Sequence, residues 1–387
     1  MNGWEQVKLG DLYSVHNGIS KGKQFFGKGY PFLSFSTVFN NWFLPLKLDS
    51  LVESTEQEQS SYSIKRGDVF VTRTSETMDE LGMSSVALND FPNATYNGFT
   101  KRLRPITNKV LPEFIGYYLR SPKFRGKFMA FSSMTTRASL SNAELLSLQI
   151  ELPCLKVQYN IATILRSYDN LIDNYRRQIE LMEESAQRLY KEWFVSLRFP
   201  GYEHTKIVDG VPEGWEKKNI GELLEKIKRT KQIPSSEMQK HGLYPVIDQG
   251  KQYIAGYTND VSAILYNENP IIVFGDHTRI IKLIPFPFAK GADGTQLLLS
   301  NNLKRMPQSL FYYSLKNVDL SNYSYARHFK YLKTKTIFLP SDSIAQNFNA
   351  NVFPVIKEIQ KYREQMIFLT EARDRLLPKL MSGEIKV

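Results

Sequence analysis

Between Ile161 and Trp193, apolar side chains recur in alternating steps of four and three residues. The repeat runs through Ile161, Leu165, Tyr168, Ile172, Tyr175, Ile179, Met182, Ala186, Leu189 and Trp193, and mostly polar residues separate them. A mean spacing of about 3.5 residues predicts a helix whose narrow apolar seam faces a partner helix, as in a coiled coil. At about 1.5 Å per residue this helix would be about 50 Å long. An ordinary amphipathic core helix is the alternative, although such helices are usually shorter.

A second stretch near the end of the chain has the same spacing. Its seam positions are Val352, Val355, Ile359, Tyr362, Met366, Leu369, Arg373, Leu376 and Leu380. Because proline lacks a backbone N–H and clashes with the preceding turn, we expect this helix to begin or kink near Pro354 and to bend or end near Pro378. The two stretches are predicted to pack as one antiparallel pair within the chain.

The chain also contains an internal repeat. Residues 3–12 (GWEQVKLGDL) and 214–223 (GWEKKNIGEL) have at least four of ten residues identical. Further matches keep the same order: Pro112 with Pro307, Leu152–Pro153 with Leu339–Pro340, and Gln158 with Gln346. This pattern predicts a tandem duplication in which each half is a globular part followed by a long helix.

Each globular part mixes predicted strands and short helices. Residues 67–73 and 270–275 are typical of strands, and residues 111–119 and 310–316 of short helices. Without regular βαβ alternation, the mixture predicts an α+β fold with an internal pseudo-twofold repeat. The predicted segments are a first domain (1–152), a first helix (153–201), a second domain (202–343) and a second helix (344–387).

The formal net charge of +11 is concentrated in corresponding parts of the two halves. Residues 101–137 carry nine Lys or Arg against Glu113, and residues 304–335 carry seven against Asp319, with aromatic residues between them. Clusters of this kind can neutralise the phosphates of a nucleic acid, so the pattern favours DNA as the partner. A solvated basic face is the alternative.

Two strand ends supply candidate base-reading residues, because Arg, Lys, Asn and Gln can pair with base edges. These are Arg73–Thr74 and His277–Thr278–Arg279, and we add Arg137, Arg327 and Lys330 as phosphate or base contacts. The full set of candidate DNA contacts is Lys21, Lys23, Arg73, Thr74, Arg102, Arg104, Arg137, Lys228, Arg229, His277, Thr278, Arg279, Arg327 and Lys330.

The sequence predicts no catalytic centre and no metal site. Cys154 is the only cysteine, the five histidines lack metal-ligand spacing, and Asn269–Pro270–Ile271 does not supply the Asn/Asp-Pro-Pro-aromatic motif of adenine methyltransferases. A single-chain nuclease or methyltransferase and a protein-binding scaffold are the competing hypotheses. With no apparent signal peptide or membrane-spanning run, we expect a cytoplasmic protein and no membrane partner.

Several segments together resemble the specificity subunit of type I restriction–modification systems (HsdS). They are Leu152–Pro153 and residues 158–165 (QYNIATIL), 192–195 (EWFV), 198–201 (RFPG), 212–215 (PEGW) and 375–385 (RLLPKLMSGEI). The resemblance implies two target-recognition domains separated by conserved helices, and assembly with two methyltransferase subunits and with restriction subunits. S-adenosylmethionine, ATP and Mg would then be bound by those partners, and this chain would hold no cofactor.

The resemblance further implies that each domain reads one half of a bipartite, asymmetric DNA site. Half-sites on one face of the duplex lie about 34 Å apart, so a pair of long helices could set the unread spacer. Asn347 and Pro354 depart from the good helix formers usual in the second helix of this family. No base-reading residue is carried over, because the recognition domains are the variable part of the family.

Overall fold

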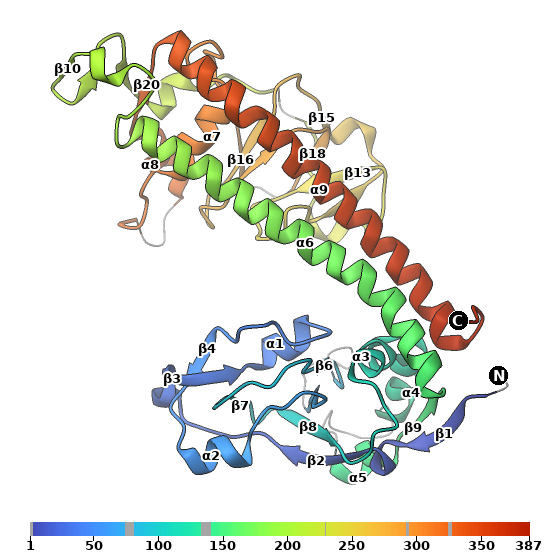
Figure 1. The fold of residues 1–387 in the computed structure, drawn as a ribbon. Helices are drawn as coiled ribbons and strands as arrows, with labels where there is room; N and C mark the ends of the chain where they lie inside the picture. Colours follow the sequence, from blue (N-terminus) through green and yellow to red (C-terminus); the bar gives the residue numbers. More distant parts are fainter. Residues whose placement is uncertain (1–2, 74–80, 133–140, 229, 292–293, 324–326) are drawn as a thin grey trace. The chain divides into compact units, whose positions relative to one another are not determined.

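The computed structural model describes residues 3–73, 81–132, 141–228, 230–291, 294–323 and 327–387. The chain forms two compact units, unit 1 (Met1–Asp173 and Met366–Val387) and unit 2 (Asn174–Gln365). Each unit mixes strands with helices (Figure 1), which confirms the predicted α+β class. No helix in the described part of the chain has both the length and the apolarity that a membrane crossing requires.

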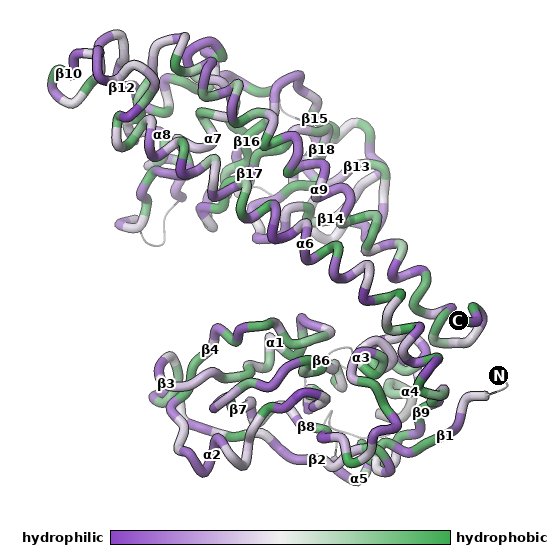
Figure 2. The backbone as a smooth tube through the Cα atoms, viewed as in Figure 1, coloured by the Kyte–Doolittle hydropathy of each residue, from purple (hydrophilic) through white to green (hydrophobic). Residues whose placement is uncertain are grey.

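Two long helices contribute to both units, α6 (Leu155–Phe194) with 40 residues and α9 (Asp342–Ser382) with 41. Within unit 1, Ile161 and Leu165 of α6 share a buried core with Leu380 of α9. Within unit 2, the rings of Tyr190 and Phe348 lie 6.2 Å apart. In each unit the helices pack antiparallel, as predicted, and polar and apolar residues alternate along both (Figure 2).

The residues of the predicted seam are shielded from solvent along both helices. Every seam residue is buried or half-buried: Ile161, Leu165, Tyr168, Ile172, Tyr175, Ile179, Met182 and Leu189 in α6, and Val355, Ile359, Tyr362, Met366, Leu369 and Leu376 in α9. The two tyrosines Tyr175 and Tyr362 stack with ring centroids 4.8 Å apart.

The second helix neither begins at Pro354 nor ends at Pro378, because α9 continues through both prolines; a kink or bend at either proline stays a prediction. Pro354 removes one helical hydrogen bond, but Phe348, Val352 and Ile356 on either side of it are buried in the core of unit 2. Leu377 and Met381 flank Pro378 and are buried in the core of unit 1. Tertiary packing therefore outweighs the local preference to end the helix. The division into four segments at 152, 201 and 343 stays a prediction.

Unit 1 is built on two sheets and a separate strand pair. Its strands are β1 (Glu5–Lys8), β2 (Tyr13–Asn17), β3 (Phe26–Leu33), β4 (Ser50–Val52), β5 (Val69–Thr72), β6 (Ser84–Val86), β7 (Thr95–Tyr96), β8 (Thr100–Pro105) and β9 (Gln149–Leu152). Its shorter helices are η1 (Leu9–Asp11), η2 (Lys23–Phe25), α1 (Phe35–Asn40), α2 (Glu56–Ser61), α3 (Pro112–Arg120), α4 (Pro122–Ser132) and α5 (Asn142–Ser147). The sheet orders are β2-β8-β5-β6 and β4-β3-β7, and β1 pairs with β9.

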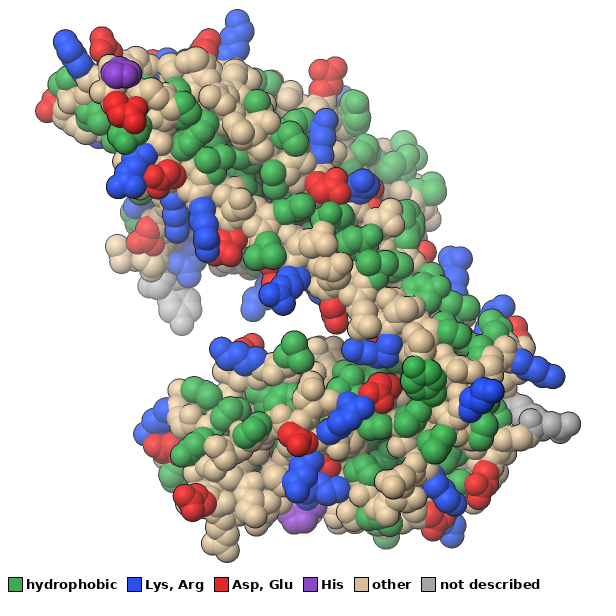
Figure 3. All heavy atoms as spheres, viewed as in Figure 1, with side chains coloured by type: hydrophobic (Ala, Val, Ile, Leu, Met, Phe, Trp, Pro, Cys, Tyr) green, Lys and Arg blue, Asp and Glu red, His purple; other side chains and the backbone are tan. Residues whose placement is uncertain are grey.

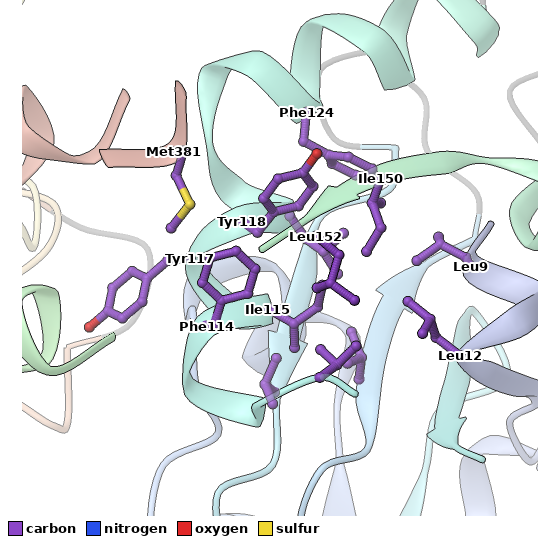
Figure 4. Packing of buried hydrophobic residues seen from close by; sticks show 14 of the residues in the cluster. Leu9, Leu12, Phe114, Ile115, Tyr117, Tyr118, Phe124, Ile150, Leu152 and Met381 are labelled. Carbon is purple, nitrogen blue, oxygen red and sulfur yellow. The ribbon is translucent and has the colours of Figure 1, made fainter. Parts of the chain in front are cut away.

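The core of unit 1 forms around α3 (Figure 4). Phe114, Tyr117 and Tyr118 of this helix are fully buried. Leu9 and Met381 belong to the same cluster, so the first and last parts of the chain meet in this core.

Unit 2 is built on two larger sheets and two strand pairs. Its strands are β10 (Ile207–Val208), β11 (Val211–Pro212), β12 (Glu216–Asn219), β13 (Tyr244–Ile247), β14 (Gly256–Thr258), β15 (Ile264–Leu265), β16 (Ile271–Gly275), β17 (Ile281–Ile284), β18 (Phe288–Lys290), β19 (Thr295–Leu298) and β20 (Thr336–Leu339). Its shorter helices are η4 (Tyr202–His204), η5 (Ile220–Leu223), η6 (Ser235–Glu237), η7 (Val261–Ala263), α7 (Gln308–Lys316) and α8 (His328–Thr334). The larger sheets have orders β17-β16-β19 and β14-β13-β18-β15, β12 pairs with β20, and β10 pairs with β11.

The duplication is visible in matching contacts. In unit 1, β1 pairs with β9 from Glu5 opposite Leu152, and in unit 2, β12 pairs with β20 from Glu216 opposite Leu339. A methyl group added at Gly10 or at Gly221 would in each case lie 3.2 Å from a carbonyl oxygen of the helix before the last strand. The two halves therefore share one fold, as the internal repeat predicted.

Candidate nucleic-acid interface

The two units present corresponding loops where their central strands end. In unit 1, Thr72 pairs with Thr100, and the Arg73 N–H donates to the carbonyl of Phe99 over 2.8 Å. In unit 2, Gly275 pairs with Thr295, and the Asp276 N–H donates to the carbonyl of Gly294 over 2.7 Å. We call the surrounding residues tip 1 (Arg73, Phe99, Lys101, Asn142) and tip 2 (Lys228, Asp276, His277, Gln296, Arg327).

Tip 1 holds two cations near each other. Lys101, the second residue of β8, is buried and its Nζ donates to Oδ1 of Asn142 at the start of α5. That helix begins with a capping box, in which Ser141 and Glu144 each accept the other's backbone N–H. Burial lowers the pKa of Lys101, and the positive charge of Arg73 lowers it further. An anion placed at tip 1 would relieve this repulsion, so the tip is suited to a phosphate or to a base acceptor.

Three other candidates in unit 1 are engaged inside the protein. Arg102 is buried, donates to the carbonyl of Ser63 over 2.6 Å, and lies over the ring of Tyr96. Arg104 binds the buried carboxylate of Asp68 through Nε at 2.8 Å and Nη2 at 2.6 Å, and this hydrogen bonding raises its pKa. Lys21 Nζ donates to Glu58 over 2.7 Å. These contacts bind the three side chains within unit 1, and their predicted contact with DNA stays a prediction.

Tip 2 is formed by the hairpin between β16 and β17. All residues of β16 are buried, and the hairpin is anchored by Gln249, whose side-chain oxygen accepts the His277 N–H and whose carbonyl accepts the Thr278 hydroxyl. Asp276 is buried and accepts the Phe329 N–H over 2.8 Å. Because Phe329 lies in the first turn of α8, this bond fixes the start of that helix, where Arg327 is the N-cap.

The side chains of tip 2 line a polar pocket of about 490 Å³. Lys228, Lys290 and Arg327 supply three cations at its wall, against the single carboxylate of Asp276. Gln232 and Gln296 add amides, and Thr230 adds a buried hydroxyl without a hydrogen-bond partner among the described residues. Arg and Lys pair with guanine edges and Gln with adenine edges, so the pocket can present the groups that read bases.

The structure thus brings together three residues singled out in the sequence, Lys228, His277 and Arg327. The other two hairpin candidates have structural contacts: Thr278 binds the Gln249 carbonyl, and Arg279 donates to the Leu320 carbonyl over 3.0 Å. Lys23 and Lys330 are exposed. Thr74, Arg137 and Arg229 lie outside the described residues. Whether any of these residues contacts DNA stays a prediction.

Sequence reasoning missed Phe99, Gln232 and Gln296 and counted Lys101 only as one charge in a cluster. Their positions depend on strand register, which the sequence does not display. Figure 3 shows Lys and Arg side chains interspersed with Asp and Glu on the viewed face of each unit. The positions of the two tips therefore follow from the pairing of the strands, and counting charges along the sequence does not identify them.

Comparison with known proteins agrees with this architecture. The family described as "Type I restriction modification DNA specificity domain" matches residues 1–184 and 212–341. The MjaIX specificity subunit of a type I restriction enzyme from Methanocaldococcus jannaschii is 26% identical over 420 residues, which cover 99% of this chain and 94% of that protein. The putative MjaX specificity subunit of the same organism is 27% identical over 410 residues, covering 99% and 94%.

A solved structure shares the fold. The S subunit of a type I restriction–modification system from M. genitalium superimposes with a TM-score of 0.57 at 18% identity, covering 98% of this chain and 96% of that one. The two matched segments coincide with the two halves of the duplication and together span most of the sequence. The chain therefore belongs to the type I restriction–modification DNA specificity family.

Proposed function

We propose that this chain is the DNA-reading subunit of a type I restriction–modification complex, and that tip 1 and tip 2 each read one half of a bipartite, asymmetric site. The relatives named as specificity subunits support the class of function. The basic balance of the chain, +11, supports a polyanionic partner. The chain would do no chemistry itself; S-adenosylmethionine, ATP and Mg would be bound by partner subunits in the cytoplasm.

The observation that carries the proposal is that the two tips correspond in position and differ in chemistry. By strand register, Arg73 corresponds to Asp276, and Lys101 corresponds to Gln296. A duplicated reader with identical tips would favour a site with two equal halves. A lysine in one tip and a glutamine at the corresponding position of the other favour different bases, because Lys pairs with the edge of guanine and Gln with the edge of adenine. Unlike tips therefore favour two unlike half-sites.

The long helices would fix the unread spacer and bind the methyltransferase subunits. Helices of 40 and 41 residues correspond to rods of about 60 Å, long enough to relate half-sites about 34 Å apart. Leu171 and Leu181 of α6 and Phe368 of α9 are exposed at 38%, 56% and 62%. These three side chains are our candidates for contacts with the methyltransferase subunits. The internal repeat favours two methyltransferase subunits, with restriction subunits added for cleavage.

Selection from a pool of randomised duplexes tests the proposed reading. The full-length chain, in complex with its methyltransferase subunits, should enrich two short, unlike motifs at a fixed separation. Arg327→Ala and Lys228→Ala should each weaken binding by about 1–3 kcal/mol if they contact bases, and relax preference in one motif only. Lys206→Ala is the matched control, because that side chain is exposed in unit 2 outside both the pocket and the long helices. Unchanged selection by both pocket variants would contradict the role of tip 2.

The spacer proposal has a separate test. Inserting seven residues into both α6 and α9 keeps the apolar seam in phase and lengthens each helix by about 10 Å. The unread gap of the modified site should then lengthen, or modification should be lost. An unchanged gap would show that the helices do not set it.

A further inference from the structure

Phe99 is an apolar side chain displayed at tip 1. It lies in the turn between β7 and β8 and is 62% exposed. Its carbonyl accepts the Arg73 N–H, and β8 begins at the next residue and continues with Lys101. A phenyl ring that stays exposed to water does not contribute the favourable free energy that its burial would provide. A ring kept exposed between two cationic positions is therefore suited to cover an apolar surface of a charged ligand.

The turn that carries Phe99 is fixed by hydrogen bonds. Asn97 Oδ1 accepts the Phe99 N–H over 2.7 Å, and the Asn97 carbonyl accepts the Thr100 hydroxyl over 2.7 Å. Neighbouring glycines allow a close approach: a methyl group added at Gly18 would lie 2.0 Å from the Asn97 carbonyl oxygen. The ring is thus held on an ordered support, which lowers the entropic cost of placing it against a ligand.

Unit 2 has no side chain at the corresponding position. The residue that accepts the Asp276 N–H is Gly294, as Phe99 accepts that of Arg73. A methyl group added at Gly294 would lie 2.2 Å from Nε2 of Gln249, so the Gln249 side chain that accepts the His277 N–H would have to move. Tip 1 therefore presents an aromatic ring where tip 2 presents the edge of a polar pocket.

We propose that Phe99 contacts a base directly in the half-site read by unit 1, and so determines part of its specificity. DNA exposes apolar surface as the thymine methyl group in the major groove and as the faces of bases that are partly unstacked. Phe99 covers one of these surfaces while Arg73 attracts the adjoining phosphate, and the buried charge of Lys101 adds to the positive potential of the tip. The inference rests on the proposed function, and it adds an apolar base contact that charge counting could not show.

The test compares Phe99→Ala with Ile106→Ala in the full-length chain with its methyltransferase subunits. Ile106 is 60% exposed and follows the other end of β8, about 20 Å away along the strand. Randomised-pool selection by the unaltered chain first defines both half-sites. Phe99→Ala should then bind the selected duplex at least about tenfold more weakly and lose preference at one or two adjacent positions of one half-site. Ile106→Ala should leave affinity and preferences unchanged.

Two modified duplexes identify the surface that Phe99 covers. Deoxyuridine in place of the affected thymine removes only the methyl group; weaker binding by the unaltered chain, with no further loss in Phe99→Ala, assigns the methyl contact. A rise in 2-aminopurine fluorescence at that step, absent with Phe99→Ala, assigns contact with an unstacked base. The inference is overturned if Phe99→Ala binds within about twofold of the unaltered chain with the same preferences. If the unaltered chain enriches no motif, the proposed function itself fails.

Discussion

Replacing Asp169 with leucine should destabilise unit 1 more than any exposed ion pair would. Arg373 is the one charged residue in the predicted seam of α9, and its Nη1 donates to Asp169 Oδ1 over 2.6 Å. The other oxygen of Asp169 accepts the hydroxyl of Tyr117. The guanidinium carbon of Arg373 also lies 4.7 Å from the ring centroid of Trp42. A single carboxylate on α6 therefore accepts hydrogen bonds from one side chain on α9 and one on α3.

The magnitude follows from burial. The side chains of Arg373 and Asp169 are 14% and 13% exposed, and removing one partner of a buried pair costs about 3–5 kcal/mol. Arg373 keeps a second contact with Asp374 at 2.8 Å, whereas the Tyr117 hydroxyl loses its partner. We therefore expect Asp169→Leu to lower the free energy of unfolding by about 3 kcal/mol. Asp169→Leu with Arg373→Leu should recover at least about 1 kcal/mol, because an apolar pair leaves no buried charge.

Urea unfolding of the full chain measures the loss, and hydrogen exchange of α3 amides assigns it to unit 1. Arg375→Leu is the matched control: it removes an arginine from the same helix, 83% exposed and 3.8 Å from Glu371. That control should change the free energy of unfolding by less than about 0.5 kcal/mol. If Asp169→Leu stays within the same limit, the pair does not hold the helices in register, and the reasoning fails.

Three further predictions follow from other contacts. Gly18→Ala should weaken DNA binding, because its methyl group would lie 2.0 Å from the Asn97 carbonyl beneath tip 1; unchanged binding in a titration would contradict this. Gln158→Ala should lower the free energy of unfolding by about 2–3 kcal/mol, because this buried amide accepts the Leu111 N–H over 2.9 Å and donates to two carbonyls. Gln346→Ala, at the exposed corresponding position of the repeat, should cost less; equal losses in urea unfolding would contradict this prediction. Burial raises the pKa of Tyr118 and Tyr253 from 10.0 to about 12. The stability that these two neutral hydroxyls contribute is therefore complete below pH 10 and is lost as the pH rises to about 12. A titration followed by phenolate absorbance should show additional tyrosines ionising near pH 10 in the unfolded chain compared with the folded chain.

The helical pair was predictable because its spacing directly encodes burial: residues three and four apart share one face of a helix. The ends of α9 were not predictable from the prolines. Phe348, Val352 and Ile356 gain more from the core of unit 2 than Pro354 costs, and only the tertiary structure shows that gain.

The candidate site was predicted in part. Strand ends located His277, the basic cluster at 304–335 located Arg327, and the pocket of tip 2 brings both together with the candidate Lys228. Charge clustering also selected Arg104, whose partner Asp68 lies 36 residues away in the sequence. Pairing of that kind, and the register that places Phe99 beside Arg73, depend on contacts between distant strands. Counting charges therefore identified the positively charged segments, but it could not distinguish side chains that line the pocket from side chains bound within the protein.

Mapping methylated adenines across the genome of a host that carries this chain and its partner subunits tests the central proposal most directly. We predict one motif with two unlike short halves and a fixed run of unspecified base pairs between them. In the same host, Arg327→Ala should relax only one half and Phe99→Ala only the other. A contiguous motif, a motif with two identical halves, or both substitutions acting on the same half would contradict the reading of one half-site by each tip.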